Sequence, residues 1–513
     1  MSSSANPPGP LLERAARSAF WNATLLPLIT IFNLVAAIVI RRYFGLQSGQ
    51  YDVMLGLVNS WLMWSGLGLP AAITQFAGQL EADGGRRALQ AFLARIAGAR
   101  IALLVLLLVP VNLFAEPLAQ RLALGDAGAL LIHLASVWAL FRAANDLVTK
   151  SLQALLRHLA ANLLLLAQAV GSAFAVVLVV RNDGAISTVI VGLICVATVL
   201  AALGFLHVQR SVRTASPADA DVASEIPAIR RVSQFSTFMY GLNWLQYFAS
   251  PAFASPAIAA VTGLAAPVAL FNVGVQLPQM AIVLVLAGLQ GLYRPLFSRL
   301  VKGDPAQLRN AFVEITKLQS LVLLPAGMGL VVMADWYIPI MFGDEYMAAA
   351  ELTRVLAVLL TCEALFNLGG IILTADHRYR AVACAESARL VAAAVFVYLA
   401  AQGNLVAAAA AFGGGRATAS VLAYWSGRQR YGLRFPMAFL ARAAMPTLVM
   451  GLALWQIRGT LESTLVSAIG VTLLGALIVA ICTKLFRVLG PAEIDLIERS
   501  RLPAGRHLVR WLR

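Results

Sequence analysis

The sequence GAISTVIVGLICVATVLAALGFLHVQ runs from Gly184 to Gln209 without a single Asp, Glu, Lys or Arg. A helix of about 20 apolar residues crosses the ~30 Å hydrocarbon core of a membrane, so this stretch is long enough for one crossing. The whole chain has the same character, because 60% of its 513 residues are hydrophobic and only 12% are charged. A water-soluble domain carries about 25% charged residues. The composition therefore excludes soluble enzymes, nucleic-acid-binding proteins and disordered proteins.

Similar runs with few charges recur along the sequence and predict an all-α polytopic membrane protein with about fourteen transmembrane helices. The run 232–293 is long enough for two crossings, with Pro251, Pro256 and Pro267 at the break between them. A count of twelve helices is the alternative. The predicted helices cover residues 18–40, 51–76, 96–115, 128–149, 159–180, 184–207, 232–250, 266–290, 314–334, 351–374, 381–401, 405–426, 436–457 and 464–484.

The basic residues predict how these helices are oriented. Lys and Arg collect in the cytoplasmic loops of membrane proteins, and this chain has a net charge of +15. With the N-terminus inside, most of the basic residues fall in cytoplasmic loops, among them Arg100 and Lys150, and in the C-terminal tail. We therefore expect both termini in the cytoplasm. The opposite side receives only Arg41, Arg42, Arg121, Arg181 and Arg458.

An internal repeat predicts that the helices form two lobes. A constant shift along the sequence places Leu80–Phe92 on Leu300–Phe312 and Tyr51 on Phe271. Because six crossings are an even number, both halves enter the membrane in the same sense and form two pseudo-symmetric six-helix lobes. The expected domains are an N-terminal lobe at 1–207, a cytoplasmic linker at 208–231, a C-terminal lobe at 232–426, and two additional helices with a basic tail at 427–513.

Ionisable residues inside the predicted helices are the candidate functional residues. A charge at the centre of a transmembrane helix costs at least ~2.5 kcal/mol on insertion scales, so it faces a partner or a water-filled cavity. Guanidinium groups bind phosphate through paired hydrogen bonds, which favours a cationic cavity for an anionic substrate. The candidate substrate-binding residues are Arg142, Arg354, Arg389, Arg416 and Arg442, and the candidates for proton or ion coupling or for charge balance are Asp146, Glu363 and Glu386.

Two alternatives compete with the cavity for these charges. The first is ion pairing, since Arg142 and Asp146 are four residues apart and Glu386 and Arg389 are three apart, so each pair shares a helix face. The second is snorkelling of arginines to the membrane surface. For Arg389 and Arg442, which are close to a cytoplasmic helix end, these alternatives are favoured over the cavity.

The sequence also lacks the motifs that catalysis or ATP hydrolysis would require. It contains no GxxxxGK[ST] loop and no His and Cys residues at metal-ligand spacing. We therefore expect no enzyme activity, no cofactor, no metal and no nucleic-acid partner. The energy for transport would come from a gradient of H⁺ or Na⁺, from the membrane potential or from the substrate gradient.

Several short stretches of the sequence carry a family resemblance, namely Phe20–Asn22, Arg42–Gly45, Gly49–Tyr51, Gly66–Phe76 and Met341–Tyr346. They resemble the Wzx-type polysaccharide flippases of the multidrug/oligosaccharidyl-lipid/polysaccharide exporter superfamily. The resemblance implies two lobes around a central cationic cavity that opens alternately to each side of the bacterial inner membrane. The implied substrate is an oligosaccharide repeat unit on undecaprenyl pyrophosphate, used for O-antigen, capsule or exopolysaccharide synthesis. The implied partners are membrane lipids, a polysaccharide polymerase and a chain-length regulator.

Three other functions remain open at this stage. A multidrug or cation antiporter of the same superfamily should have an acidic and aromatic site, whereas arginines at least match acids here. Lipid II flippases typically carry an arginine-rich first helix, and this chain has no charge between Arg17 and Arg41. A membrane-embedded polymerase or ligase should have a large outer loop with catalytic arginine and histidine, but the predicted outer loops are short.

Overall fold

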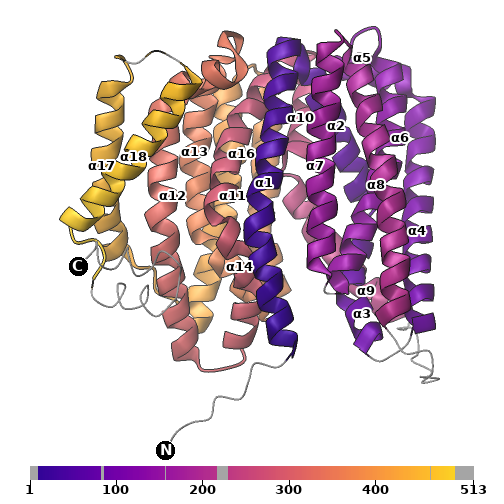
Figure 1. Cartoon of the computed structure of the whole chain (residues 1–513), viewed down its shortest axis with the longest axis horizontal. Coiled ribbons are helices and arrows are strands. Elements are labelled where there is room, and N and C mark those ends of the chain that lie inside the picture. Colours follow the sequence, from indigo (N-terminus) through magenta and orange to yellow (C-terminus); the bar gives the residue numbers. More distant parts are fainter. Residues whose placement is uncertain are drawn as a thin grey trace, which may run out of the picture. The chain divides into compact units, whose positions relative to one another are not determined.

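The computed structural model describes residues 10–82, 86–155, 157–215, 229–460, 462 and 464–490 (Figure 1). All regular secondary structure in these ranges is helical, which confirms the predicted all-α class. Helices are expected because backbone groups in hydrocarbon find no water and must bond within their own segment. The elements are α1 (Pro10–Phe44), η1 (Gly45–Gln47), α2 (Ser48–Trp64), α3 (Leu69–Ala82), α4 (Arg86–Leu113), α5 (Ala115–Arg121), α6 (Gly128–Ala154), α7 (His158–Arg181), α8 (Ile186–Ala215), α9 (Ile229–Tyr247), α10 (Pro251–Thr262), α11 (Ala265–Leu300), α12 (Pro305–Phe342), η2 (Asp344–Tyr346), α13 (Ala349–Phe366), α14 (Leu368–Ala375), α15 (Tyr379–Ala401), α16 (Leu405–Tyr431), α17 (Met437–Ile457) and α18 (Leu465–Leu485).

In the described part of the chain, 12 helical segments are long and apolar enough to cross a membrane, so the protein is a multi-pass membrane protein. The first of them, Thr24–Trp64, joins α1 and α2 in 41 residues. At 1.5 Å per residue this is about 60 Å, twice the ~30 Å thickness of the hydrocarbon core. The number of membrane crossings therefore depends on whether this segment is counted as one crossing or two, and on whether the shorter α9 and α10 are counted. The count of fourteen transmembrane helices stays a prediction.

Two helices that the sequence predicts as continuous are broken in the structure. The predicted helix 51–76 forms α2 and α3, with a turn at 65–68, and 351–374 forms α13 and α14, divided at Asn367. The predicted helix 232–250 ends early as α9, and α10 follows, with Pro251 in its first turn and Pro256 inside it. Pro256 therefore does not lie in a break. A proline is tolerated near a helix start because the first N–H groups have no partner in the helix.

The chain forms two compact units. The first contains the described residues up to Asn272, together with Ala287–Leu292 and Ala393–Leu405. In it, α6 packs against α2, α3, α4, α7 and α8, and Figure 1 shows α4, α6 and α8 side by side. An apolar core that includes Phe76, Phe92 and Leu147 joins α3, α4 and α6. This core fixes α4 and α6 next to each other.

Gly68 in the turn between α2 and α3 shows how closely this unit is packed. Its φ of +73° lies in the left-handed region that favours glycine. A Cβ atom at this position would overlap with the carbonyl oxygen of Ser236 in α9. The turn therefore requires glycine for its backbone conformation and for its contact with α9.

The second unit contains Val273–Leu286, Tyr293–Ala392 and the described residues from Val406 onward. Its long helix α12 packs against α13, α17 and α18. Met333 and Trp336 of α12 contact Met450 and Leu454 of α17 in a buried core, which Ala468 of α18 completes. The two helices predicted to lie outside the repeat are thus anchored on α12. The predicted domain boundaries at 207, 232 and 426 stay a prediction.

Candidate functional site: a cationic pocket in the first unit

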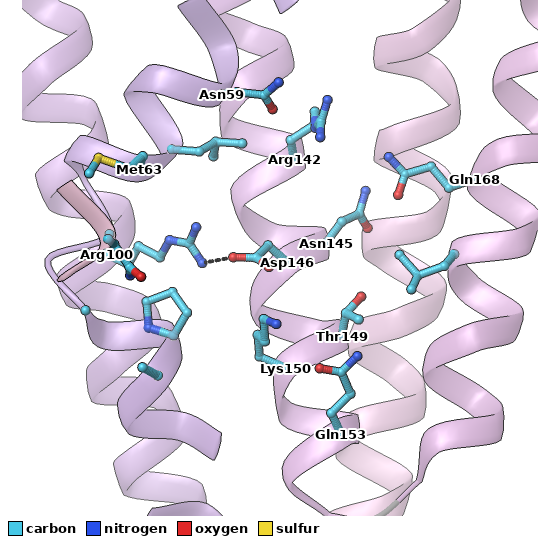
Figure 2. A pocket seen from close by; sticks show the side chains of 17 residues that line it. Asn59, Met63, Arg100, Arg142, Asn145, Asp146, Thr149, Lys150, Gln153 and Gln168 are labelled. Carbon is cyan, nitrogen blue, oxygen red and sulfur yellow. Dashed lines mark hydrogen bonds and ion pairs between the residues drawn. The ribbon is translucent and has the colours of Figure 1, made fainter. Parts of the chain in front are cut away.

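A cavity of about 500 Å³ opens in the first unit. Its lining comes from α2, α3 and the turn that joins them, and from α4, α6, α7 and α9. Figure 2 shows its polar side chains. This volume is in the range of small-molecule binding sites, but the lining has far more polar groups than such sites usually contain. The residues of the pocket therefore point to a charged or hydroxyl-rich ligand.

One face of α6 supplies most of the polar lining. Residues three, four, seven and eight positions apart lie on the same side of a helix. In α6 this spacing aligns a series of polar and charged side chains along the pocket, from one end of the cavity to the other (Figure 2). The series is Arg142, Asn145, Asp146, Thr149, Lys150 and Gln153.

Asp146 forms an ion pair with Arg100 of α4. The Arg100 Nη1 atom lies 2.6 Å from Asp146 Oδ2, as the dashed line in Figure 2 marks. The Arg100 side chain is only 2% exposed, whereas that of Asp146 is 37% exposed and faces the pocket. The sequence placed Arg100 in a cytoplasmic loop, but it lies well inside α4. The carboxylate of Asp146 thus neutralises a buried guanidinium.

Arg142 forms no ion pair with Asp146, although the sequence spacing allowed one. Long side chains on a helix lean toward its N-terminus, and the guanidinium of Arg142 accordingly lies over the ring of Trp138, one turn earlier, at 5.4 Å from its centroid. Asp146 lies one turn later. Within the described residues, neither Arg142 nor Lys150 has a carboxylate within ion-pair distance. These two cations are therefore the uncompensated charges of the pocket.

Four other predicted site residues form a cluster of balanced charge in the second unit. The Glu363 carboxylate of α13 accepts from Arg416 Nε of α16 at 2.7 Å and from Arg389 Nη2 of α15 at 3.3 Å. Arg389 Nε also lies 2.6 Å from Glu386 Oε2, which confirms the expected pair within one helix. All four side chains are between 13% and 17% exposed. Two arginines and two glutamates therefore neutralise each other across three helices.

Arg354 and Arg442, the last two predicted arginines, lie elsewhere in the second unit. Arg354 Nη2 lies 3.0 Å from Asp335 Oδ2 of α12, and Arg458, directly after α17, contacts the same carboxylate at 3.1 Å. Arg442 is exposed, and its Nε donates to the Ala438 carbonyl of its own helix at 3.4 Å. Of the five predicted arginines, Arg142 is therefore the one that lines the pocket of the first unit, within the described part of the chain.

The candidate site residues inferred from the sequence include neither Arg100 nor Lys150, although both line the pocket. Their sequence context indicates cytoplasmic loops instead. The periodic series on α6 could have identified Lys150, because it continues the spacing of Arg142 and Asp146 by one further turn. No sequence pattern connects Arg100 with Asp146, because their pairing depends on which helices are neighbours.

Comparison with known proteins identifies the family. A family model described as "Polysaccharide biosynthesis protein" matches residues 63–351, more than half of the chain. The teichuronic acid biosynthesis protein TuaB of Bacillus subtilis (strain 168) is 33% identical over 84 residues, which are 16% of this chain and 17% of that protein. The chain thus matches about a sixth of the length of this curated relative.

Solved structures show the same fold. The structure described as "Lipid II flippase MurJ, inward closed conformation" has a TM-score of 0.71, with 11% identity, and the match covers 92% of this chain and 98% of that one. A multidrug resistance MATE family transporter of the MOP superfamily, in an inward-facing conformation, has a TM-score of 0.60, with 14% identity over 81% of this chain and 98% of that one. These likenesses establish the fold alone. The chain belongs to the polysaccharide biosynthesis protein family and has the fold of the multidrug/oligosaccharidyl-lipid/polysaccharide exporter superfamily, which confirms the resemblance seen in its sequence.

Proposed function

We propose that this protein moves undecaprenyl-pyrophosphate-linked oligosaccharide repeat units across the bacterial inner membrane by alternating access. The product would serve the synthesis of O-antigen, capsule or exopolysaccharide, and both termini would lie in the cytoplasm. The family and the fold support a translocase rather than a catalytic enzyme. The finer proposal rests on the chemistry of the pocket in the first unit.

The observation that carries the proposal is the pair of uncompensated cations on α6. In a membrane-spanning unit, a charge without a partner is costly unless it faces water or a counter-ion. Arg142 and Lys150 both line the pocket, and Asp146 is already engaged by Arg100. A pyrophosphate group accepts hydrogen bonds from guanidinium and ammonium donors and would neutralise both charges. The pocket therefore suits an anionic headgroup.

The same observation disfavours a multidrug or cation antiporter, because a cationic pocket repels cations.

The acidic residues were expected to serve either in ion coupling or in charge balance, and their ion-pair partners favour charge balance. Asp146 is paired with Arg100, Glu363 with Arg389 and Arg416, and Glu386 with Arg389. Coupling to H⁺ or Na⁺, and assembly with a polymerase and a chain-length regulator, remain parts of the proposal that the family resemblance supplies.

The test is translocation by the full-length protein in liposomes that contain a fluorescent undecaprenyl-pyrophosphate oligosaccharide. We expect Arg142→Gln to reduce the initial rate of translocation at least tenfold, because the anion loses its uncompensated guanidinium. The matched control is Arg442→Gln, which removes an exposed arginine that does not line the pocket, and it should retain the wild-type rate. Equal rates for wild type and Arg142→Gln would refute the proposed role of the pocket.

A further inference from the structure

The cationic pocket also contains amide side chains that a pyrophosphate does not require. Four amide residues from four helices line it: Asn59 of α2, Gln153 of α6, Gln168 of α7 and Asn243 of α9. Within the described chain, none of these four side chains forms a hydrogen bond with the protein. Asn145, also in the lining, is different, because its Nδ2 donates to the Ala197 carbonyl of α8 at 3.0 Å. The four amides are therefore available to a ligand.

Amide groups suit hydroxyl groups better than they suit phosphate. A carboxamide presents two N–H donors and one carbonyl acceptor. Phosphate oxygens at neutral pH only accept, so they leave the amide carbonyl unused, whereas a sugar hydroxyl both donates and accepts. Asn59, Gln153 and Gln168 are half-buried and Asn243 is exposed, so their amide groups are accessible to a ligand in the pocket. Four such amides in one pocket thus indicate a neutral, hydroxyl-rich ligand group.

The amides lie next to the cations that would hold the anion. Figure 2 shows Asn59 and Gln168 on different helices on either side of Arg142. Gln153 is three residues after Lys150 and therefore lies on the same face of α6. The cavity of about 500 Å³ lies within the range of roughly 300–1,000 Å³ that is typical of small-molecule sites. A pyrophosphate group fills only part of this space, so a sugar ring can enter beside it.

Aromatic contacts hold the helices that carry two of the amides. Trp64 at the end of α2 and Trp244 of α9 stack in parallel, with ring centroids 6.2 Å apart. The Tyr240 hydroxyl of α9 donates to the Trp64 carbonyl at 3.2 Å. These contacts join the helices of Asn59 and Asn243. The amides are thus placed by a packed interface within the first unit.

We propose that Asn59, Gln153, Gln168 and Asn243 bind the sugar that is attached directly to the pyrophosphate and so select glycosylated carrier lipids over the bare carrier. This inference rests on the proposed function and adds a specificity to it. A site that hydrogen-bonds hydroxyl groups rejects an analogue that lacks them, because its own polar groups then stay unpaired. The selection would prevent transport of undecaprenyl pyrophosphate that carries no glycan.

The experiment measures binding to the purified full-length protein in nanodiscs. The probes are undecaprenyl pyrophosphate and the same lipid with one N-acetylglucosamine, galactose or glucose residue. We expect at least one glycosylated lipid to bind wild type about tenfold more tightly than the bare lipid. Asn59→Leu and Gln168→Met keep the side-chain size and should each weaken that lipid about two- to tenfold, the range for one hydrogen bond. The affinity for the bare lipid should not change.

Two controls separate the possible failures. Gln75→Met removes an exposed amide of α3 outside the pocket lining and should leave both affinities unchanged, and the melting temperature of each variant reports folding. Equal binding of bare and all glycosylated lipids, or equal loss of both in the amide variants, would overturn the sugar inference while the proposed function stands. If Arg142→Gln weakens neither lipid, the proposed function itself fails.

Discussion

Arg142 in the first unit and Arg416 in the second are both arginines inside predicted transmembrane helices, but their surroundings differ. Arg142 contacts an aromatic ring and lines an open pocket, without a carboxylate partner in the described chain. Arg416 likewise contacts an aromatic ring, that of Phe412, but its Nε also donates to Glu363 at 2.7 Å. The first arginine has a charge available to a ligand, and the charge of the second is already neutralised.

This difference teaches that an arginine at membrane depth is not by itself a substrate-binding residue. A charge in a low-dielectric region is stabilised either by a protein partner or by water and ligands in a cavity. The cluster around Glu363 uses protein partners and holds α13, α15 and α16 together. In the pocket, Arg142 and Lys150 of α6 have no ion-pair partner among the described residues and are available to a ligand. The two regions should therefore respond to mutation in different ways, the cluster in stability and the pocket in binding.

The largest effect is expected from Glu363→Gln in the second unit. This change removes the carboxylate that bridges Arg389 and Arg416, and it leaves two largely buried guanidiniums without their shared partner. Loss of one member of a buried ion pair costs about 3–5 kcal/mol. We expect the free energy of unfolding to fall by about that amount, measured by thermal or denaturant unfolding of the purified protein in detergent.

A double variant tests the cause of this loss. Glu363→Gln combined with Arg416→Gln removes the unpaired charge as well, while Arg389 keeps Glu386, so the double variant should be more stable than Glu363→Gln alone. Folded Arg416→Gln protein should bind the glycosylated carrier lipid as wild type does. Weaker lipid binding without a loss of stability would show that the cluster belongs to the substrate site.

A smaller effect is expected from Asp146→Asn in the pocket. The carboxylate neutralises Arg100 and faces the cavity, so it repels an anion there. Its removal adds a third uncompensated cation, and we expect the carrier lipid to bind about tenfold more tightly at low ionic strength, an effect of ~1.4 kcal/mol. Tighter binding should slow release and thus lower the turnover in liposomes.

The matched control for this prediction is Glu345→Gln, which neutralises an exposed carboxylate in the second unit, at some distance along the chain from every pocket residue. It changes the net charge by the same amount and should not alter binding. An unchanged affinity in Asp146→Asn would mean that Asp146 does not face the bound anion.

The sequence predicted the helices well and the partners of their charges poorly. Long runs without charges identify membrane-spanning segments because hydrocarbon excludes charge along a whole helix. The pair of Glu386 with Arg389 was predictable because both lie on one helix. The pairs of Arg100 with Asp146, and of Glu363 with Arg416, join different helices. No local pattern states which helices become neighbours.

The broken helices show a second limit of the sequence. The turn at Gly68 depends on a left-handed backbone and on a contact with Ser236, far away in sequence. The division between α13 and α14 at Asn367 has ordinary helical angles, with φ −61° and ψ −25°. Apolar composition continues through both breaks. Hydropathy alone therefore predicts one continuous helix at each place, although tertiary contacts decide the local conformation.

The smallest effect on stability is expected from Asp376→Asn. Asp376 lies directly after α14, outside the membrane-spanning helices, and forms an ion pair with Arg378. Burial raises the pKa of Asp376, but hydrogen bonds from Tyr431 and Arg378 and the charges of Arg378 and Arg430 outweigh it, so the pKa lies below its ordinary value of 3.8. A lowered pKa in the folded state stabilises the protein above the unfolded pKa. This contribution is lost as the pH falls through the folded pKa. Because Arg378 and Arg430 are about half exposed, we expect the charge of Asp376 to contribute ~0.2–1 kcal/mol to the free energy of unfolding. Asp376→Asn should therefore be slightly less stable than wild type at pH 7. The difference should shrink as the pH falls below the ordinary value of 3.8 and vanish below the folded pKa, measured by thermal unfolding from neutral to strongly acidic pH. If the difference in stability persists in acid, the effect of Asp376 comes from packing rather than from its charge. Ion pairing would then stabilise the Glu363 cluster but not this loop.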